Sequence, residues 1–315
     1  MSSYIVRRLL LIPITLFIIT IIVFIFMRAV PGDAGQVKCG AAGSFDETCF
    51  EQVRKELGLD KSLFEQYTLW ASDIVLRWDF GFSPISREHI NSEIGPRVWN
   101  TGQVGLLSIV FTLLIGIPVG AISAIRSGRP IDYGLRFFAV LGLSVPNFWL
   151  ATLIIIFPAV WWGTRVAPDW VGWEDPLTHL QIIAVPAFLL SLAGGATLAR
   201  IVRSSMLEVL RSDFVRTSRA KGLREAAVVG RHVFRPSMIA LFTIVGLQFS
   251  LVLGGSVIME SIFNIPGMGL WVISAVAGRD FIVIQGVVVF FAAWFLVITL
   301  LVDVMYAWVD PRIRY

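Results

Sequence analysis

A strongly basic polar stretch runs from Arg200 to Pro236, between two hydrophobic segments. It contains nine Arg or Lys residues against three acids. Positive charge of this kind can meet a soluble protein partner or the anionic lipid of a membrane surface. The same excess is expected in any cytoplasmic loop of a membrane protein, because Lys and Arg set orientation. Charge alone therefore leaves docking and orientation as two open explanations of this stretch.

The middle of this basic stretch has a helical pattern. We expect a helix over residues 207–220, which Gly222 is placed to end. A short helix that lies outside the bilayer and is joined at both ends to membrane-crossing helices can be moved by a soluble partner. Such a movement would carry both spans with it.

Patterns that carry catalysis are missing from the sequence. It has no GxxxxGK[ST] phosphate loop, no HExxH motif and no GxSxG motif. Its three histidines fall in different segments, and we expect His179 to be a solvated surface residue rather than a ligand. We therefore expect no catalytic residue, no metal site and no cofactor in this chain, and no binding of nucleic acid.

The composition indicates a membrane protein with little soluble mass. Of the 315 residues 56% are hydrophobic and 15% are charged, and the mean hydropathy is +0.78. A helical span needs about 20 apolar residues, and a β-barrel would instead show short alternating strands. We predict an all-α polytopic fold whose first span is retained rather than cleaved. The six predicted spans are residues 9–30, 104–124, 137–161, 181–202, 238–259 and 282–306.

The distribution of charge predicts the orientation of these spans. With the N-terminus inside, the inner segments hold sixteen Lys and Arg and six acids, and the outer segments hold ten and sixteen. Lys and Arg accumulate on the cytoplasmic side. We therefore expect both termini in the cytoplasm.

We divide the chain into three parts. Residues 1–30 hold the N-terminus and first span, 31–100 form an external loop, and 101–315 form a five-helix core. Capping boxes at Ser44-x-x-Glu47 and Ser62-x-x-Glu65 predict two short amphipathic helices in the loop. These helices suggest a small external cap packed on the spans, and a surface loop with fraying helices is the alternative.

The two cysteines of the chain, Cys39 and Cys49, both lie in this external loop. An oxidising compartment favours a disulfide between them. Closing so short a loop stabilises the fold by roughly 3 kcal/mol in the chain-entropy model. Metal binding by two cysteines alone is the weaker alternative.

Several spans contain residues that affect helix packing or bending. Gly116-x-x-x-Gly120 in the second span predicts close contact with another helix. Ser144-Val145-Pro146 predicts a kink in the third span, and Pro186 with Gly194-Gly195 allows the fourth to bend.

The middles of the spans contain almost no ionisable residues, since Glu260 and Asp303 lie near span ends. Proton-coupled transporters and ion sites depend on such residues. This argues for a passive, gated path driven by another subunit. A secondary transporter or channel remains an alternative, although neither mid-span charges nor an inverted repeat is evident. A membrane-embedded enzyme lacks any catalytic cluster.

A series of short motifs in fixed order resembles one family from end to end. The motifs are Pro31-Gly32-Asp33, Gly58-Leu59-Asp60, Gln66-Tyr67, Asp79-Phe80-Gly81-Phe82-Ser83, Arg97, Thr101, Arg200-x-x-Arg203-Ser204-Ser205-Met206, Phe214 to Leu223, Arg231-His232, Glu260-x-x-Phe263-x-x-Pro266-Gly267-x-Gly269, Asp303, Tyr306 and Asp310-Pro311-Arg312. The family is that of the dipeptide/oligopeptide/nickel permeases, the membrane subunits of bacterial ABC importers. This chain resembles the type with a large external loop after the first span.

The resemblance implies a type I importer permease fold that forms half of a translocation path for peptides or related small solutes. It also implies a homologous second permease, two ATPase subunits that bind ATP and Mg, an external solute-binding protein and a place in the bacterial inner membrane. In the family a cytoplasmic coupling helix, within the EAA loop, docks on the ATPase. Carried over, the docking residues are Arg211, Asp213, Phe214, Arg216, Arg219, Ala220, Lys221 and Gly222.

The chain departs from the family pattern at two places. Arg216, Thr217 and Ser218 stand where the motif opens with Glu-Ala-Ala, and Glu225-Ala226-Ala227 is out of register. The family usually has proline where Ala240 stands, so the resemblance does not fix the start of the fifth span.

The run at the predicted external end of the fifth span has two interpretations. Its Pro-Gly-x-Gly sequence suits tight backbone bends, which makes it a structural turn. The alternative is an external gate or lip. The residues concerned are Glu260, Phe263, Pro266, Gly267 and Gly269.

Overall fold

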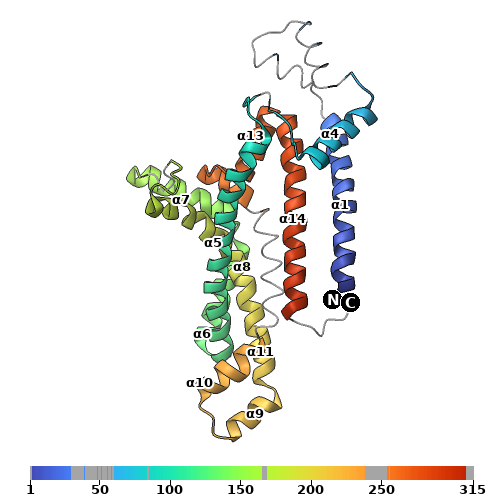
Figure 1. The fold of residues 1–315 in the computed structure, drawn as a ribbon. Helices are drawn as coiled ribbons and strands as arrows, with labels where there is room; N and C mark the ends of the chain where they lie inside the picture. The colour runs from blue at the N-terminus through green and yellow to red at the C-terminus, as the bar shows by residue number, and fades with distance from the viewer. Residues whose placement is uncertain are drawn as a thin grey trace. The chain divides into compact units, whose positions relative to one another are not determined.

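The computed structural model describes residues 2–29, 60–83, 85–164, 169–237 and 256–309, with single positions at 39, 48, 51, 55, 58 and 254. In these ranges every regular element is a helix, and the β-type pairing consists of one isolated bridge between Phe82 and His89. The predicted all-α class is confirmed (Figure 1). The chain packs as two units, each described by itself below. The three predicted parts of the chain stay predictions.

The first unit comprises residues 1–100 and 266–300. It holds α1 (Ser2–Ala29), α4 (Leu63–Arg77), the start of α5 (Ile90–Ile125), α13 (Met268–Gly278) and most of α14 (Phe281–Val309).

The predicted capping box at the start of α4 is confirmed. The Ser62 side chain accepts from the Glu65 N–H, and Glu65 accepts from the Ser62 N–H. Tyr67 of α4 then packs edge-on against Phe24 of α1, with its hydroxyl 3.0 Å from that of Thr20. Residues 63–77 therefore form a helix packed against the first predicted span, and the external cap stays a prediction.

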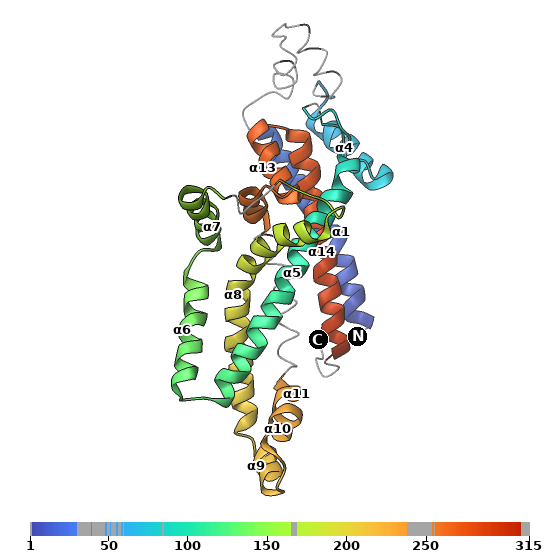
Figure 2. The ribbon, with the colours of Figure 1, turned by 90° about the vertical axis from the view of Figure 1, so that its left-hand side faces the viewer.

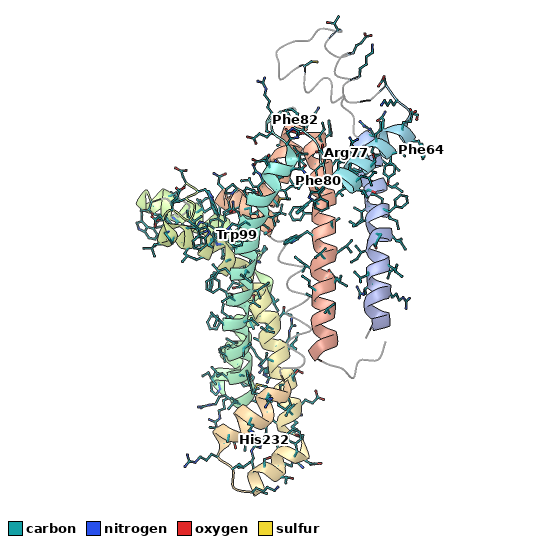
Figure 3. The ribbon with its side chains drawn as sticks, in the orientation of Figure 1. Phe64, Arg77, Phe80, Phe82, Trp99 and His232 are labelled. Carbon is teal, nitrogen blue, oxygen red and sulfur yellow. The ribbon has the colours of Figure 1, made fainter. Side chains whose placement is uncertain are left out.

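A buried apolar core organises the rest of the first unit. Phe80 is buried and packs edge-on against Phe290 of α14, and Figure 3 shows its side chain lying toward that helix. Gly286 of α14 faces the Phe80 backbone so closely that a Cβ there would lie 3.0 Å from the Phe80 oxygen.

The second unit comprises residues 101–265 and 301–315. After α5 it contains a bent helix pair, a long helix, and several short elements beyond the end of that long helix (Figure 1). These elements are α6 (Pro130–Ser144), α7 (Asn147–Trp162), α8 (Pro176–Leu210), α9 (Asp213–Ala220), α10 (Glu225–Ala227), the π-helix η1 (Val228–Phe234), α11 (Arg235–Ser237) and a helix over Ser256–Phe263.

Four helices in the described part of the chain are long and apolar enough to cross a membrane, or up to six if each bent pair forms one span. The third predicted span is not straight, because α6 and α7 meet at 88°. The break lies at Val145 and Pro146, where the kink was predicted. The fifth predicted span, residues 238–259, lies mostly outside the described residues.

Close packing joins α5 to α8, as the glycine spacing predicts. A Cβ at Gly120 would lie 2.5 Å from the Ala199 oxygen, and one at Gly116 would lie 2.8 Å from the Leu198 side chain. Only glycine lets the two backbones approach this closely. Figure 2 shows that α8 bends along its length, and it contains Pro186.

Candidate functional site

The basic stretch begins within α8, which ends at Leu210. Arg211 and Ser212 form a tight turn, in which the Ser212 hydroxyl donates to the Val209 carbonyl at 2.6 Å. A serine that bonds the preceding turn competes with helix continuation. The continuous helix predicted over residues 207–220 is therefore wrong at its start, because residues 207–210 belong to α8 and α9 begins at Asp213.

Val215 fixes α9 to the rest of the second unit. Its side chain is fully buried in an apolar cluster with Val228 and Val233 of η1 and Met206 of α8. The sequence analysis missed this residue. Its signal is weak, because one valine among charged neighbours forms no apolar stripe, and burial depends on η1 folding back beneath α9.

The docking residues expected from the sequence lie on the exposed side of this segment. Phe214 stands out because 49% of an aromatic side chain remains in contact with solvent. An exposed aromatic beside arginines is a common composition of protein interfaces. The exposed members are Arg211, Asp213, Phe214, Arg216, Arg219, Ala220, Lys221 and Gly222.

An ion pair closes the turn between α9 and α10. Arg219 donates to both carboxylate oxygens of Glu225, at 2.7 and 3.2 Å, and these hydrogen bonds lower the pKa of Glu225. Gly222 lies inside this turn with φ +76°, a left-handed conformation in which a side chain is strained. The predicted helix stop at Gly222 is confirmed. Glu225, which is out of register with the family motif, stabilises the turn through its ion pair with Arg219.

The segment after α10 is a π-helix. The η1 helix over Val228–Phe234 carries Arg231, which is exposed, and His232, which Figure 3 places at this end of the unit. A π-helix is rare and often marks a functional position. Here its extra residue per turn lets both Val228 and Val233 face the cluster around Val215.

A buried carboxylate links α6 to α8 above this segment. Asp132 of α6 is fully buried and accepts from Arg203 of α8 at two positions, both 3.0 Å. It also accepts from the Ser123 hydroxyl and, at 3.0 Å, from the Gly128 N–H. Such a network was not predicted, because Asp132 and Arg203 are far apart in the sequence. It ties the α5–α6 turn to the end of the long helix that carries α9.

Residues of the external run are largely buried. In the second unit the Glu260 carboxylate is buried and accepts from the Thr101 hydroxyl at 2.8 Å, and Phe263 is also buried. In the first unit Gly267 and Gly269 are buried, and the Asn100 amide donates to the Pro266 oxygen at 2.9 Å. This burial agrees with a structural turn. The gate or lip role stays a prediction.

The expectation of a solvated His179 is wrong. His179 is fully buried near the start of α8, with Trp173 at 4.6 Å and Trp170 at 5.0 Å between ring centroids. Its two ring nitrogens lie 2.8 Å from the Val171 oxygen and 2.8 Å from the Gln103 side chain. Tryptophans that seem to mark only a membrane interface in the sequence instead enclose this histidine.

The expected disulfide stays a prediction. Cys39 is fully buried, and Cys49 lies outside the described residues.

Comparison with known proteins covers nearly the whole chain. Residues 116–315 match the family described as "Binding-protein-dependent transport system inner membrane component", and residues 1–87 match the N-terminal model of binding-protein-dependent transport system membrane components. Glutathione transport system permease protein GsiC of Escherichia coli strain K12 is 38% identical over 319 residues, covering 100% of both chains. A Brucella abortus protein named for a peptide transport system permease is 37% identical over 305 residues, covering 96% of both.

Solved structures show the same fold. The chain is similar to a subunit of the MetNI methionine ABC transporter in inward-facing conformations, with a TM-score of 0.55 and 19% identity over 68% of this chain and 95% of the other. It is also similar to an amino acid ABC transporter, with a TM-score of 0.51 and 15% identity over 67% and 91%. The fold is that of type I importer permeases.

Proposed function

The chain belongs to the family of binding-protein-dependent transport system inner membrane components, and from this premise we propose that α9 and the turn after it are the surface on which ATPase subunits drive the importer. The chain is a permease subunit of an ABC importer. Its proposed cargo is a peptide or a related small solute such as glutathione, the class in the names of its relatives. It would form half of the path together with a homologous second permease.

The observation that carries this proposal is the division of α9 into one buried and many exposed positions. Val215 fixes the helix to η1 and α8, whereas Phe214, Arg216 and Arg219 are left in solvent. A helix that served only to join two spans would not need an exposed aromatic side chain. The arrangement supports a contact that is made with another protein and transmitted through α8.

ATP hydrolysis and the binding of Mg are proposed to belong to two partner ATPases, and solute recognition to an external solute-binding protein. The permease can be shifted between conformations only if α9 contacts the ATPases differently in their ATP-bound and free states. The proposal requires α9 and both termini to be in the cytoplasm, which the charge asymmetry of the sequence supports.

Charge reversal at the turn tests the docking role. In the assembled importer in proteoliposomes, Arg219→Glu should reduce solute-stimulated ATP hydrolysis and uptake together while the complex still inserts in the membrane. Arg77→Glu on α4 is the matched control, because Arg77 is also exposed and paired with a neighbouring carboxylate, Asp73, at 3.1 Å. Normal uptake by Arg219→Glu would refute the docking role.

A charge swap separates docking from simple closure of the turn. The double variant Arg219→Glu with Glu225→Arg restores an ion pair but reverses its direction. If Arg219 only closes the turn, the swap restores uptake. If its charge meets the ATPase, uptake stays low. Gly222→Glu should also reduce solute uptake. Gly222→Asn should retain more uptake, because asparagine tolerates the left-handed φ.

A further inference from the structure

Two adjoining cavities lie between α5, α6 and α8, all within the second unit. Each has a volume of about 340 Å³, and together they form one groove along α6. The upper cavity is lined by apolar side chains and glycines alone, among them Phe138 and Leu192. The residues that line both cavities are Val119, Leu135, Ala139, Ala196 and Ala199.

The lower cavity has a basic end. Arg136 of α6 and Arg200 and Arg203 of α8 line it, together with the hydroxyls of Ser123 and Ser204. Three arginines therefore line one of the two cavities, whereas the other is lined by apolar residues and glycines.

Two of these arginines retain capacity for an anion. Arg203 is committed to Asp132 by two hydrogen bonds. Arg136 makes only a longer contact with Asp132, at 3.4 Å, and lies over the Tyr133 ring. Arg200 is exposed, and among the described residues it makes no ion pair. The buried Asp132 contacts two of the three arginines, Arg203 and Arg136, and the adjacent turn adds Arg126 and Arg129.

The basic end coincides with the end of the membrane helices. Arg203 is level with Asp132, which is in the first turn of α6, and α5 ends nearby at Ile125. The seven residues of α8 beyond Arg203 extend about 10 Å further. The arginines thus lie near the end of these candidate spans, where lipid headgroups would be, and the apolar cavity lies nearer to their middle.

Side chains along the apolar part face outward from the protein. Phe138 is 70% exposed and Val140 is 60% exposed, although both line the groove. A groove with exposed apolar walls and a cationic end matches an amphiphile that carries negative charge at one end. A water-soluble peptide has no comparable separation of polar and apolar parts.

We propose that this groove is a binding site for an anionic phospholipid. The phosphate is held by Arg136 and Arg200, and one acyl chain lies along Ala139 and Phe138 of α6. The site is independent of the docking role of α9. It joins a lipid to the same α6–α8 pair that the Asp132–Arg203 ion pair connects.

Lipid retention tests the site on the assembled, detergent-purified importer. Native mass spectrometry would compare phosphatidylglycerol with phosphatidylcholine of identical acyl chains, added after delipidation. We expect phosphatidylglycerol to be retained preferentially, and Arg200→Gln and Arg136→Gln each to weaken its retention about fivefold, the effect of removing one cation at an anionic membrane surface. Arg77→Gln on α4 removes the same charge outside the groove and should leave phosphatidylglycerol retention unchanged.

Two further experiments distinguish a specific lipid site from annular lipid and from a simple anion site. Ala139→Phe fills the groove without changing charge, and should weaken phosphatidylglycerol retention, whereas inorganic phosphate at millimolar concentration should fail to displace the lipid. Equal retention of both lipids, or displacement by phosphate, overturns the proposal in favour of annular lipid or a simple anion site. In an Ala139→Cys variant, protection of the new thiol from labelling by the second permease would also overturn the proposal, because a protein would then occupy the groove.

Discussion

The two ends of α8 hold polar groups in opposite environments. Near its start, His179 is fully buried between two tryptophans and bonded through both ring nitrogens. Beyond its other end, the Arg219–Glu225 pair is exposed. Removing the partner of a buried polar group costs the full desolvation free energy of that group. Removing the partner of an exposed group costs little, because water takes its place. The polar contacts near the start of α8 therefore stabilise a fixed local structure, whereas those beyond its end are accessible to a partner protein.

The largest effect is expected where a buried charge would lose its partner. Asp132→Ala leaves Arg203 half-buried without its carboxylate and should destabilise the chain by about 3–5 kcal/mol. Thermal unfolding of the purified complex measures this. Asp213→Ala is the control, because that side chain is 97% exposed. Equal melting temperatures for Asp132→Ala and Asp213→Ala would contradict the distinction between buried and exposed polar groups.

A smaller loss of stability is expected for a substitution near the buried start of α8. His179→Ala removes a ring packed against Trp170 and Trp173, together with its contact to the Gln103 side chain. We expect a loss of about 2–3 kcal/mol. His232→Ala, on a partly exposed histidine of η1, should melt like the original chain.

Neighbouring residues on α9 sharpen the comparison within one helix. Val215→Ser places a hydroxyl in an apolar cluster and should cost about 2 kcal/mol of stability. Phe214→Ser, one residue earlier, should leave the melting temperature nearly unchanged and reduce solute-stimulated ATP hydrolysis. A stability loss in Phe214→Ser without loss of coupling would show that the exposed face has been misassigned.

The weakest effect is expected for the pH response of the exposed pair. Arg219 lowers the pKa of Glu225, so the contribution of this pair is present above the unfolded glutamate pKa and is lost as pH falls through the lowered folded value. Coupling should therefore be constant between about pH 6 and pH 8, where glutamate is ionised in both states. Raising the salt concentration should weaken it, because exposed charges are screened. A transition near neutral pH would exclude Glu225 as the titrating group.

The sequence predicted features that depend on local pattern. The capping box at Ser62, the helix stop at Gly222 and the close approach at Gly120 follow from residue type and short spacing, and all are confirmed. The kink at Pro146 was also predicted, but not its 88° angle. That angle depends on packing in three dimensions rather than on the proline alone.

Features that depend on contacts between distant segments were not predicted. Asp132 meets Arg203, 71 residues further along the chain, and His179 meets Gln103, 76 residues away. One sequence shows charge and polarity but not burial, so the charged residues of α9 could be named in advance, whereas Val215, which holds the helix in place, could not. The serine break before α9 was missed for a related reason, since Ser212 looks like any polar helix residue.

The Asp132–Arg203 ion pair has a mechanical consequence for α8. It lies about 10 Å from the Leu210 end of this helix and about 24 Å from the bend beyond Pro186. If the part of α8 between Pro186 and Leu210 turns as one body about this ion pair, its longer arm moves roughly twofold further than its shorter arm. A displacement of one or two ångströms at the α9 end of α8 would then produce a larger displacement of the helix near Pro186, with the Asp132–Arg203 ion pair as the pivot.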